Sequence, residues 1–208
     1  MGSFPAGSTV FPQSPAPKSV NITSLHQTNQ SIGHNLSRYV ADRGGHRWKI
    51  EAQYAPLSRE DFSNLWAFIV AQRGRFSRFD YKVPGHELRG AYNPTTHSNV
   101  SVISGEAGRV VTLDGFGSTP INNLFKAGDF IRFSNFQKSY MVTSDASSTN
   151  DGQCVLNLEP AVIYSPLGAD YIYTDATFSC AFESDEFSVS YELNRTYGFT
   201  LKMFEVLI

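Results

Sequence analysis

The spacing of hydrophobic residues predicts one amphipathic helix over residues 58–74. Ser58 is a suitable N-cap with Asp61 three residues later, and Gly74 is suited to the left-handed conformation that ends a helix. No other part of the sequence has a comparable helical pattern. The apolar face therefore predicts a single helix packed on a β-sheet, with its core formed by Phe62, Leu65, Trp66 and Ile69.

Strict alternation before the helix predicts a half-buried antiparallel strand over residues 47–54. One face would carry Trp48, Ile50, Ala52 and Tyr54, and the other the polar residues between them. Upstream, the sequence predicts a short strand from Val20 and another over about 32–40, with residues 41–45 turning the chain back. After the helix, Phe76, Phe79 and Tyr81 are expected in the core.

Residues 85–175 have a different pattern from residues 47–54. Short apolar runs alternate there with clusters of Gly, Asn, Asp and Pro. This pattern predicts a small β-barrel of six short strands at about 100–103, 110–113, 130–133, 140–143, 155–158 and 171–174. The core of this barrel would contain Val102, Val111, Ile131, Phe133, Val142, Leu156 and Leu158.

Alternation returns near the C-terminus, where residues 187–203 predict a long hairpin that turns at Asn194 and Arg195. Its pattern matches strand 47–54, so we expect it to pack back on the helix. The fold class is therefore mainly β: a β-sandwich or barrel domain with one helix, from residues 19–84 and 176–208, interrupted by a small barrel over 85–175. Residues 1–18 contain four prolines and predict an extended N-terminal arm.

Composition argues against several classes of function. The 208 residues are 41% hydrophobic and 13% aromatic, and the net charge of −2 argues against a protein that binds nucleic acid by neutralising phosphates. Cys154 and Cys180 are isolated, which favours two buried free thiols over a metal or redox site. No apolar run reaches the ~20 residues of a membrane span, and the N-terminus does not resemble a signal peptide. We therefore expect folding in a cytoplasm.

The sequence contains no GxSxG, HExxH, Walker or GxGxxG motif. The histidines (His26, His34, His46, His86 and His97) are scattered; a metal site at His86, Glu87 and His97 is the alternative to surface loops. Glu183, Asp185 and Glu186 form an acidic loop that could be a solvated turn or, less simply, a pair of catalytic carboxylates. The sequence thus predicts no enzyme, no cofactor and no metal.

Three segments in this order resemble the distal tail proteins of long-tailed bacteriophages that infect Gram-negative hosts. They are RWKIEAQYAPLSREDFSNLWAFIVAQRGRFSRFDY, then FKAGDFIRF with KSYMVTSDASSTNDGQCVLNLEP, and the closing YGFTLKMFEVL. Proteins of that family have a β-sandwich "belt" domain with one helix and a small β-barrel domain, which in some relatives is OB-like. The resemblance implies that residues 19–84 and 176–208 form the belt and residues 85–175 the OB-like domain.

In that family six copies form a ring that joins the tail tube to the baseplate hub, and DNA passes through its channel. The resemblance implies a structural virion protein at the tail tip, assembled in the host cytoplasm. Its partners would be further copies, the tube protein and the hub protein, with DNA only in transit and no membrane. The acidic residues Glu183, Asp185 and Glu186 are candidates for the channel lining, or form a turn on the outside. The alternative function is a carbohydrate-binding module that recognises a host cell-surface glycan.

Overall fold

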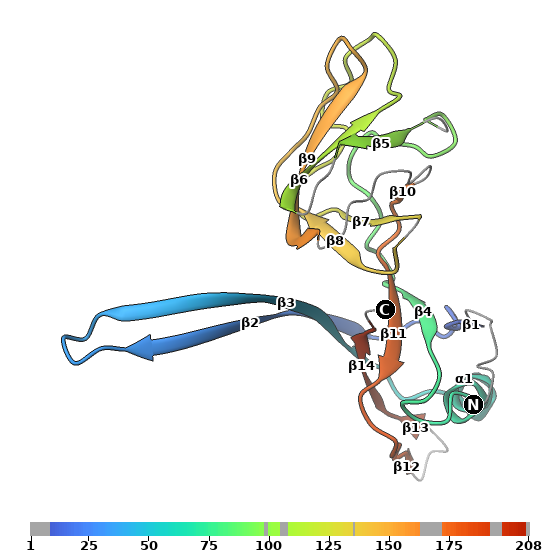
Figure 1. The fold of residues 1–208 in the computed structure, drawn as a ribbon. Coiled ribbons are helices and arrows are strands. Elements are labelled where there is room, and N and C mark those ends of the chain that lie inside the picture. Colours follow the sequence, from blue (N-terminus) through green and yellow to red (C-terminus); the bar gives the residue numbers. More distant parts are fainter. Residues whose placement is uncertain are drawn as a thin grey trace, which may run out of the picture. The chain divides into compact units, whose positions relative to one another are not determined.

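The computed structural model describes residues 9–97, 100–104, 108–134, 136–162, 172–191 and 197–206. The described chain is mainly β with a single helix, which confirms the predicted fold class (Figure 1). It divides into two compact units. The first unit contains Met1–Gln13, Arg78–Ser179 and Leu207–Ile208, and the second contains Ser14–Ser77 and Cys180–Val206.

The sheet of the second unit has the order β11 (Thr177–Phe182), β14 (Thr200–Glu205), β3 (Arg38–Gln53) and β2 (Ser19–Ile32), and β11 begins in the first unit. These neighbours are antiparallel, and Leu201 and Met203 of β14 lie opposite Ala52 and Ile50 of β3. The side chains of these four residues are buried. The alternation predicted for residues 47–54 is confirmed because one face of this strand is in the core.

Helix α1 (Arg59–Ala71) begins at the predicted cap. Asp61 N donates to Ser58 Oγ at 3.3 Å, and Ser58 Oγ donates to Asp61 Oδ2 at 2.8 Å. Of the four residues assigned to the helix core, Phe62, Leu65 and Ile69 are buried, whereas Trp66 is partly exposed. Gly74 follows the helix with a φ of +64°, as its position in the sequence predicts.

The strand predicted over about 32–40 and the turn predicted at 41–45 are wrong, whereas the strand predicted from Val20 is part of β2. β2 and β3 form one long hairpin that turns at residues 33–37, and residues 41–45 lie within β3. Gly44 has a φ of +70° and its N–H donates to Asp42 Oδ1 at 2.8 Å. Because Thr28 pairs with Asp42 and His26 with His46, residues 43–45 form a bulge opposite Gln27. The glycines therefore accommodate extra residues within a strand rather than reversing the chain.

The closing hairpin is described in part. β12 (Ser190–Tyr191) pairs with β13 (Tyr197–Gly198), while the predicted turn at Asn194 and Arg195 lies outside the described residues. Tyr197 stacks on Phe62 with ring centroids 4.6 Å apart, and Phe199 contacts the same ring edge-on at 5.6 Å. The hairpin therefore packs on the helix within the second unit.

The sheet of the first unit has the order β10 (Ile172–Tyr173), β7 (Phe130–Phe133), β8 (Ser139–Val142), β9 (Gln153–Val162), β6 (Gly108–Asp114) and β5 (Ser101–Ser104). It is curled into a half-barrel. Within it β9 pairs with β6 and, through Leu158 and Glu159, with β8. The six predicted strands are present, and every residue predicted for their core is buried: Val102, Val111, Ile131, Phe133, Val142, Leu156 and Leu158.

Two further strands belong to the first unit. β1 (Thr9–Val10) pairs in parallel with β4 (Phe79–Lys82), and Phe11 is buried against Phe79 and Tyr81. Part of the predicted N-terminal arm is therefore a strand, because Phe11 supplies an apolar anchor among the prolines. Phe76, predicted to be core, is 54% exposed. The predicted domain boundaries at 84/85 and 175/176 stay a prediction.

Candidate assembly surface

The acidic loop, Glu183–Glu186, directly follows β11 in the second unit. Glu183 Oε1 accepts a hydrogen bond from Lys49 Nζ of β3 at 2.7 Å, and both side chains are 40% exposed. A pair as exposed as this contributes only ~0–1 kcal/mol to stability. It nevertheless ties the start of the loop to the sheet and offsets the charge of Glu183.

Asp185 is held by the turn that follows α1. Its Oδ1 accepts a hydrogen bond from Arg75 N at 2.9 Å, and Arg75 Nε donates to the carbonyl oxygen of Glu183 at 2.7 Å. A Cβ at Gly74 would lie 2.4 Å from Asp185 Oδ1, so only glycine permits this close approach. Asp185 and Arg75 thus join the acidic loop to the end of the helix.

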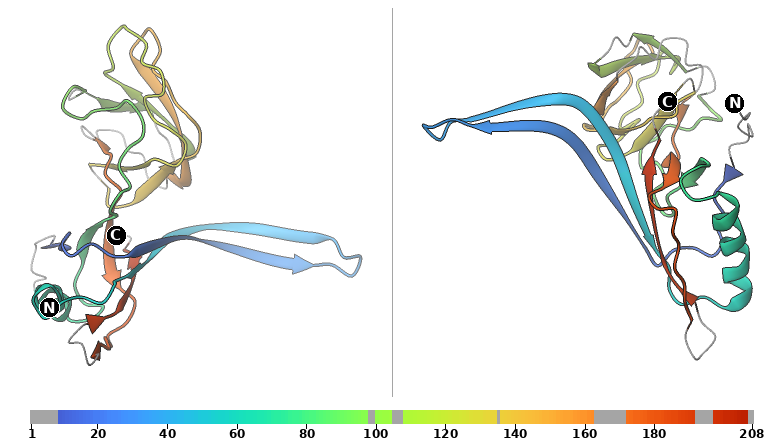
Figure 2. Two further views of the ribbon diagram at one scale, coloured as in Figure 1. Left: turned by 180° about the vertical axis from the view of Figure 1, so that it is seen from behind. Right: turned by 60° about the horizontal axis from the view of Figure 1, so that its bottom comes forward.

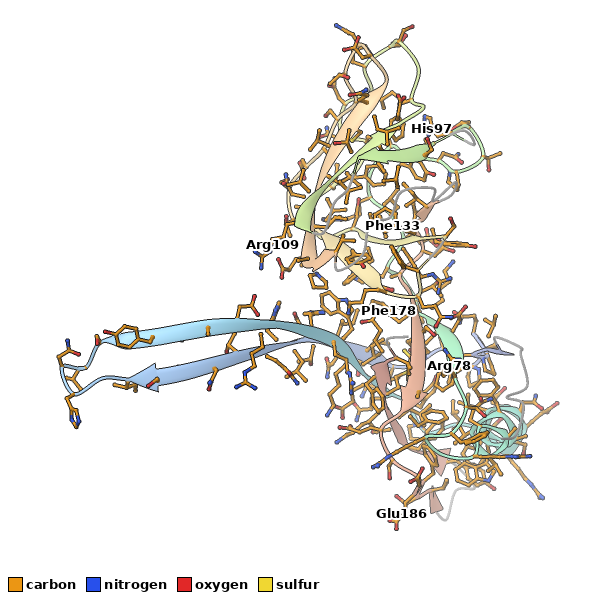
Figure 3. All side chains as sticks on the ribbon, viewed as in Figure 1. Arg78, His97, Arg109, Phe133, Phe178 and Glu186 are labelled. Atoms are coloured by element: carbon orange, nitrogen blue, oxygen red, sulfur yellow. The ribbon has the colours of Figure 1, made fainter. Side chains whose placement is uncertain are left out.

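Glu186 is exposed (Figure 3). It borders a groove of about 530 Å³ in the second unit. Its backbone N–H donates to Ser184 Oγ at 3.0 Å. The walls of the groove come from α1, from β14 and from the segments beside them, and they are apolar and polar in about equal parts. The apolar part is formed by Tyr54, Pro56, Trp66, Phe187, Phe199 and Leu201, and the polar part includes Gln53, Ser188, Thr200 and Lys202. The three candidate acids therefore have different surroundings, and Glu186 alone borders the groove.

The outer part of the β2–β3 hairpin, residues 24–47, is a two-stranded ribbon that we call the arm (Figure 1). Pairing between β14 and β3 ends at Lys49, so no third strand supports the arm in the described residues. An isolated two-stranded hairpin is only marginally stable in water. The arm also exposes apolar side chains, namely Leu25, Ile32, Leu36, Tyr39 and Val40. These features are typical of a segment that is covered by another molecule.

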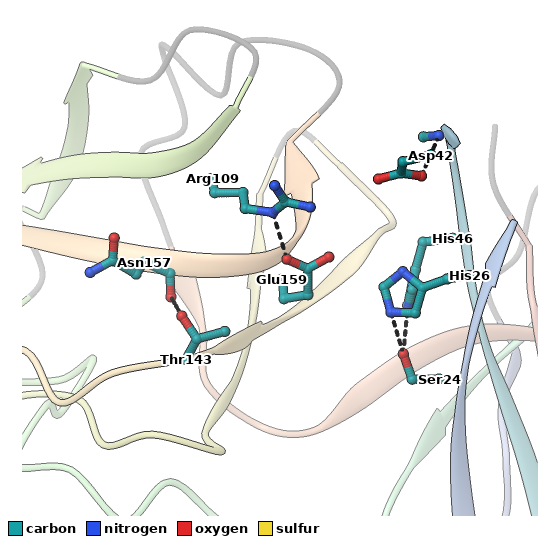
Figure 4. Close-up of polar contacts among 9 residues, drawn as sticks. Ser24, His26, Asp42, His46, Arg109, Thr143, Asn157 and Glu159 are labelled. Carbon is teal, nitrogen blue, oxygen red and sulfur yellow. Dashed lines mark hydrogen bonds and ion pairs between the residues drawn. The ribbon is translucent and has the colours of Figure 1, made fainter. Parts of the chain in front are cut away.

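A histidine pair lies at the base of the arm. His26 and His46 are cross-strand neighbours with ring centroids 4.6 Å apart. The Nε2 atoms of both point to Ser24 Oγ, at 3.0 Å and 2.8 Å respectively (Figure 4). A serine hydroxyl can donate to one of them and accept from the other, so this contact fixes the two rings next to the bulge.

The histidines considered as metal ligands are placed among aromatic rings. His86 contacts Phe130 edge-on at 5.2 Å, and His97 stacks on Tyr92 at 5.6 Å while its Nδ1 accepts from Asn93 N. Within the described residues there is no group of three or more His, Cys, Asp and Glu side chains that could hold a metal ion. The helix of the described chain is not long and apolar enough to cross a bilayer.

One comparison with known families gives a match. Residues 92–176 match the family model of the B domain of the distal tail protein pb9. Over this range the chain is similar to a distal tail protein B domain. The resemblance to phage distal tail proteins found in the sequence is thereby confirmed. No curated protein matches the chain.

The matched range contains the half-barrel of the first unit, because strands β5 to β10 all lie inside it. The acidic loop, the groove and the arm lie outside that range. Sequence reasoning identified the acidic loop but missed the arm and the groove. The signal for the arm was faint, because its β2 half is rich in Ser, Thr, Asn and Gln, its β3 half contains two glycines, and neither half alternates strictly.

Proposed function

We propose that this chain is a structural virion protein that forms a hexameric ring at the tail tip. The ring joins the tail tube protein to the baseplate or tail-tip hub protein and lets DNA pass through its channel. The match of residues 92–176 to a distal tail protein B domain is the observation that carries this proposal. The same match favours a structural role over an enzymatic one.

The second unit supplies features that support ring formation. The arm exposes apolar side chains and an unsupported hairpin, and the groove, which has an apolar part, is a separate surface of the same unit. Two different surfaces that bind head to tail generate a ring when the rotation between copies closes. An arm and a groove on each copy are one such pair.

For the channel, we propose that the acidic loop lies near the path of the DNA. Glu183 is paired with Lys49, whereas Asp185 accepts only a neutral backbone N–H and Glu186 is exposed, so Asp185 and Glu186 would provide most of the negative field. A surface of this kind repels phosphate and allows a polyanion to slide. The test is the position of Glu186 in a structure of an assembled tail, where it should face the ring axis. An outward orientation would contradict the proposed channel lining but not the proposed ring.

The ring itself is tested by light scattering on the purified chain over a wide concentration range. The expected result is a species of six times the 23.1 kDa chain mass, or an assembly that grows towards it with concentration. Electron microscopy of the tails should then locate the protein between tube and hub. A chain that is monomeric at every concentration and in the particle would contradict the proposal. That outcome would favour the carbohydrate-binding alternative, which binding to host surface glycans would test.

A further inference from the structure

We propose that Leu36, at the tip of the arm, inserts into the groove of the second unit of a neighbouring copy. The inference rests on the proposed ring, because it requires a second copy of the chain. It goes further in naming the residue that is inserted and the surface that receives it.

Leu36 is unfavourably placed in the isolated chain. Its side chain is 85% exposed, and its φ of +63° is in the left-handed region that leucine rarely adopts. The turn holds it there, since Leu36 N donates to Gly33 O at 2.9 Å and Gly33 N donates to Ser37 O at 2.9 Å. Gly or Asn would suit this position better both in conformation and in water. A strained, exposed leucine at a loop tip indicates a function that needs this side chain.

The groove offers the environment that Leu36 lacks. Trp66 is partly exposed in the isolated chain, and its indole forms one wall beside Phe187 and Phe199. With a volume of about 530 Å³, the groove can receive an aliphatic side chain. Removing a leucine side chain from water against the aromatic part of this lining is favourable.

Leu36 cannot reach the groove of its own chain. At ~3.3 Å per residue, the arm extends about 40 Å beyond Lys49, the last residue of β3 that is paired with β14. Figure 2 shows that the β2–β3 hairpin points away from α1 and β14, which line the groove. A Leu36 side chain that enters this groove must therefore belong to another copy of the chain.

A second copy supplies such an occupant, because every copy carries both the tip and the groove. Arg38 lies two residues after Leu36, and the groove is lined by the exposed carboxylate of Glu186 as well as by Lys202. Insertion of the tip would bring this cation towards that anion. Each copy then offers one tip and one groove, so the contact can repeat around a ring without leaving either surface bare.

Disulfide trapping tests the contact in the full chain. Leu36→Cys is combined with Ser188→Cys, an exposed groove residue, in a chain whose own Cys154 and Cys180 are buried. Mild oxidation should give inter-chain disulfides that build a ladder up to six copies and disappear on reduction. The matched control combines Leu36→Cys with Ala67→Cys, which is exposed on α1 but does not line the groove. It should give no ladder.

A second experiment measures assembly without cross-links. Leu36→Asn suits the left-handed turn, so it should keep or raise the thermal stability of the monomer, yet raise the concentration of half-assembly at least tenfold. Leu36→Met, which retains an apolar side chain, should assemble within about threefold of the natural chain. Trp66→Ala should weaken assembly in the same direction as Leu36→Asn.

The outcomes separate the two proposals. An oligomeric chain that gives no ladder, and that assembles equally well with Leu36→Asn, overturns the insertion and leaves the ring. A ladder that stops at two copies supports the insertion and contradicts the hexamer. If the natural chain is monomeric at every concentration and the double-cysteine variant gives no ladder, both proposals are overturned.

Discussion

At the scale of single residues, Gly74 shows how one position can have two constraints. Its φ of +64° disfavours any side chain, and Asp185 lies where a Cβ would be. Gly44 has a similar φ of +70°, but a Cβ added there would meet nothing within 4 Å. Substitutions at Gly44 and Gly74 therefore separate the effect of backbone strain on stability from the effect of steric contact, within the same unit.

We expect Gly44→Ala to lower the free energy of unfolding by about 1 kcal/mol, through backbone strain alone. Gly74→Ala should cost at least about 1 kcal/mol more, because Asp185 must move and its hydrogen bond with Arg75 N is lost. Urea denaturation of both variants measures the difference. Equal losses would show that the loop adapts without cost and that the contact with Asp185 is unimportant.

Cys154 is a residue whose chemistry is set by burial. It is fully buried in the half-barrel, and desolvation raises the pKa of its thiol from 9.0 to about 11. The folded chain therefore keeps the proton at pH values where the unfolded chain has lost it. The stabilising contribution of this residue is present below about pH 9 and is lost as the pH rises through 11.

Accordingly, Cys154 should resist thiol-specific reagents at pH 8 in the native chain and react fully in urea. Mass spectrometry of the labelled peptide measures this. Between pH 9 and 11 the natural chain should also lose more stability than a Cys154→Ala variant, since the variant lacks the titrating thiol. Rapid labelling of Cys154 under native conditions would contradict the burial of this strand.

At the scale of elements, the helix was predictable because its start and its apolar face are local properties. Ser58, Asp61 and the spacing of Phe62, Leu65 and Ile69 specify α1 without knowledge of its partner. The exposure of Trp66 was not predictable in this way. It lies on the apolar face, but the surface that it meets depends on the groove, which residues distant in sequence form.

This difference gives a prediction for the isolated monomer. Phe62→Ala should lower the free energy of unfolding by about 3–5 kcal/mol, because the ring is buried and stacks on Tyr197 and contacts Phe199. Trp66→Ala should cost clearly less, since part of the indole is exposed. Chemical denaturation at a concentration without assembly makes the comparison. A larger loss for Trp66→Ala would mean that the helix packs differently.

The arm marks the limit of reading elements from patterning. Its polar strands have no buried face to impose alternation, so sequence alone placed the turn at residues 41–45, where two glycines and Asp42 form a bulge. The actual turn at residues 33–37 also contains Gly33 and Asn35. Turn residues identify both sites, and only the pairing register distinguishes them. Partners that would cover the arm are not encoded in the local sequence.

At the scale of the whole chain, the segment between β4 and β11 has adjacent ends. Val83 N donates to Ala176 O at 3.0 Å, and Lys82 Nζ lies 2.7 Å from Asp175 Oδ2. The half-barrel between them has its own buried core, formed by residues from Tyr92 to Ile172. Loop closure across neighbouring ends carries a small entropic cost. These features support the proposal that residues 85–175 are an inserted domain.

Replacing residues 85–175 with a short Gly/Ser linker should therefore leave the remaining chain folded. It should be less stable than the full chain, because Phe178 loses its ring contact with Phe130 and Asp80 loses its ion pair with Arg132. A second variant tests whether the lost contact of Phe178 is the cause. Phe178→Ser in the deletion variant replaces the newly exposed apolar ring with a polar side chain and should improve solubility. Circular dichroism and urea denaturation measure both variants. If the deletion variant unfolds even with this substitution, the half-barrel is required to fold the rest, and the insertion proposal fails because the two parts share one folding unit.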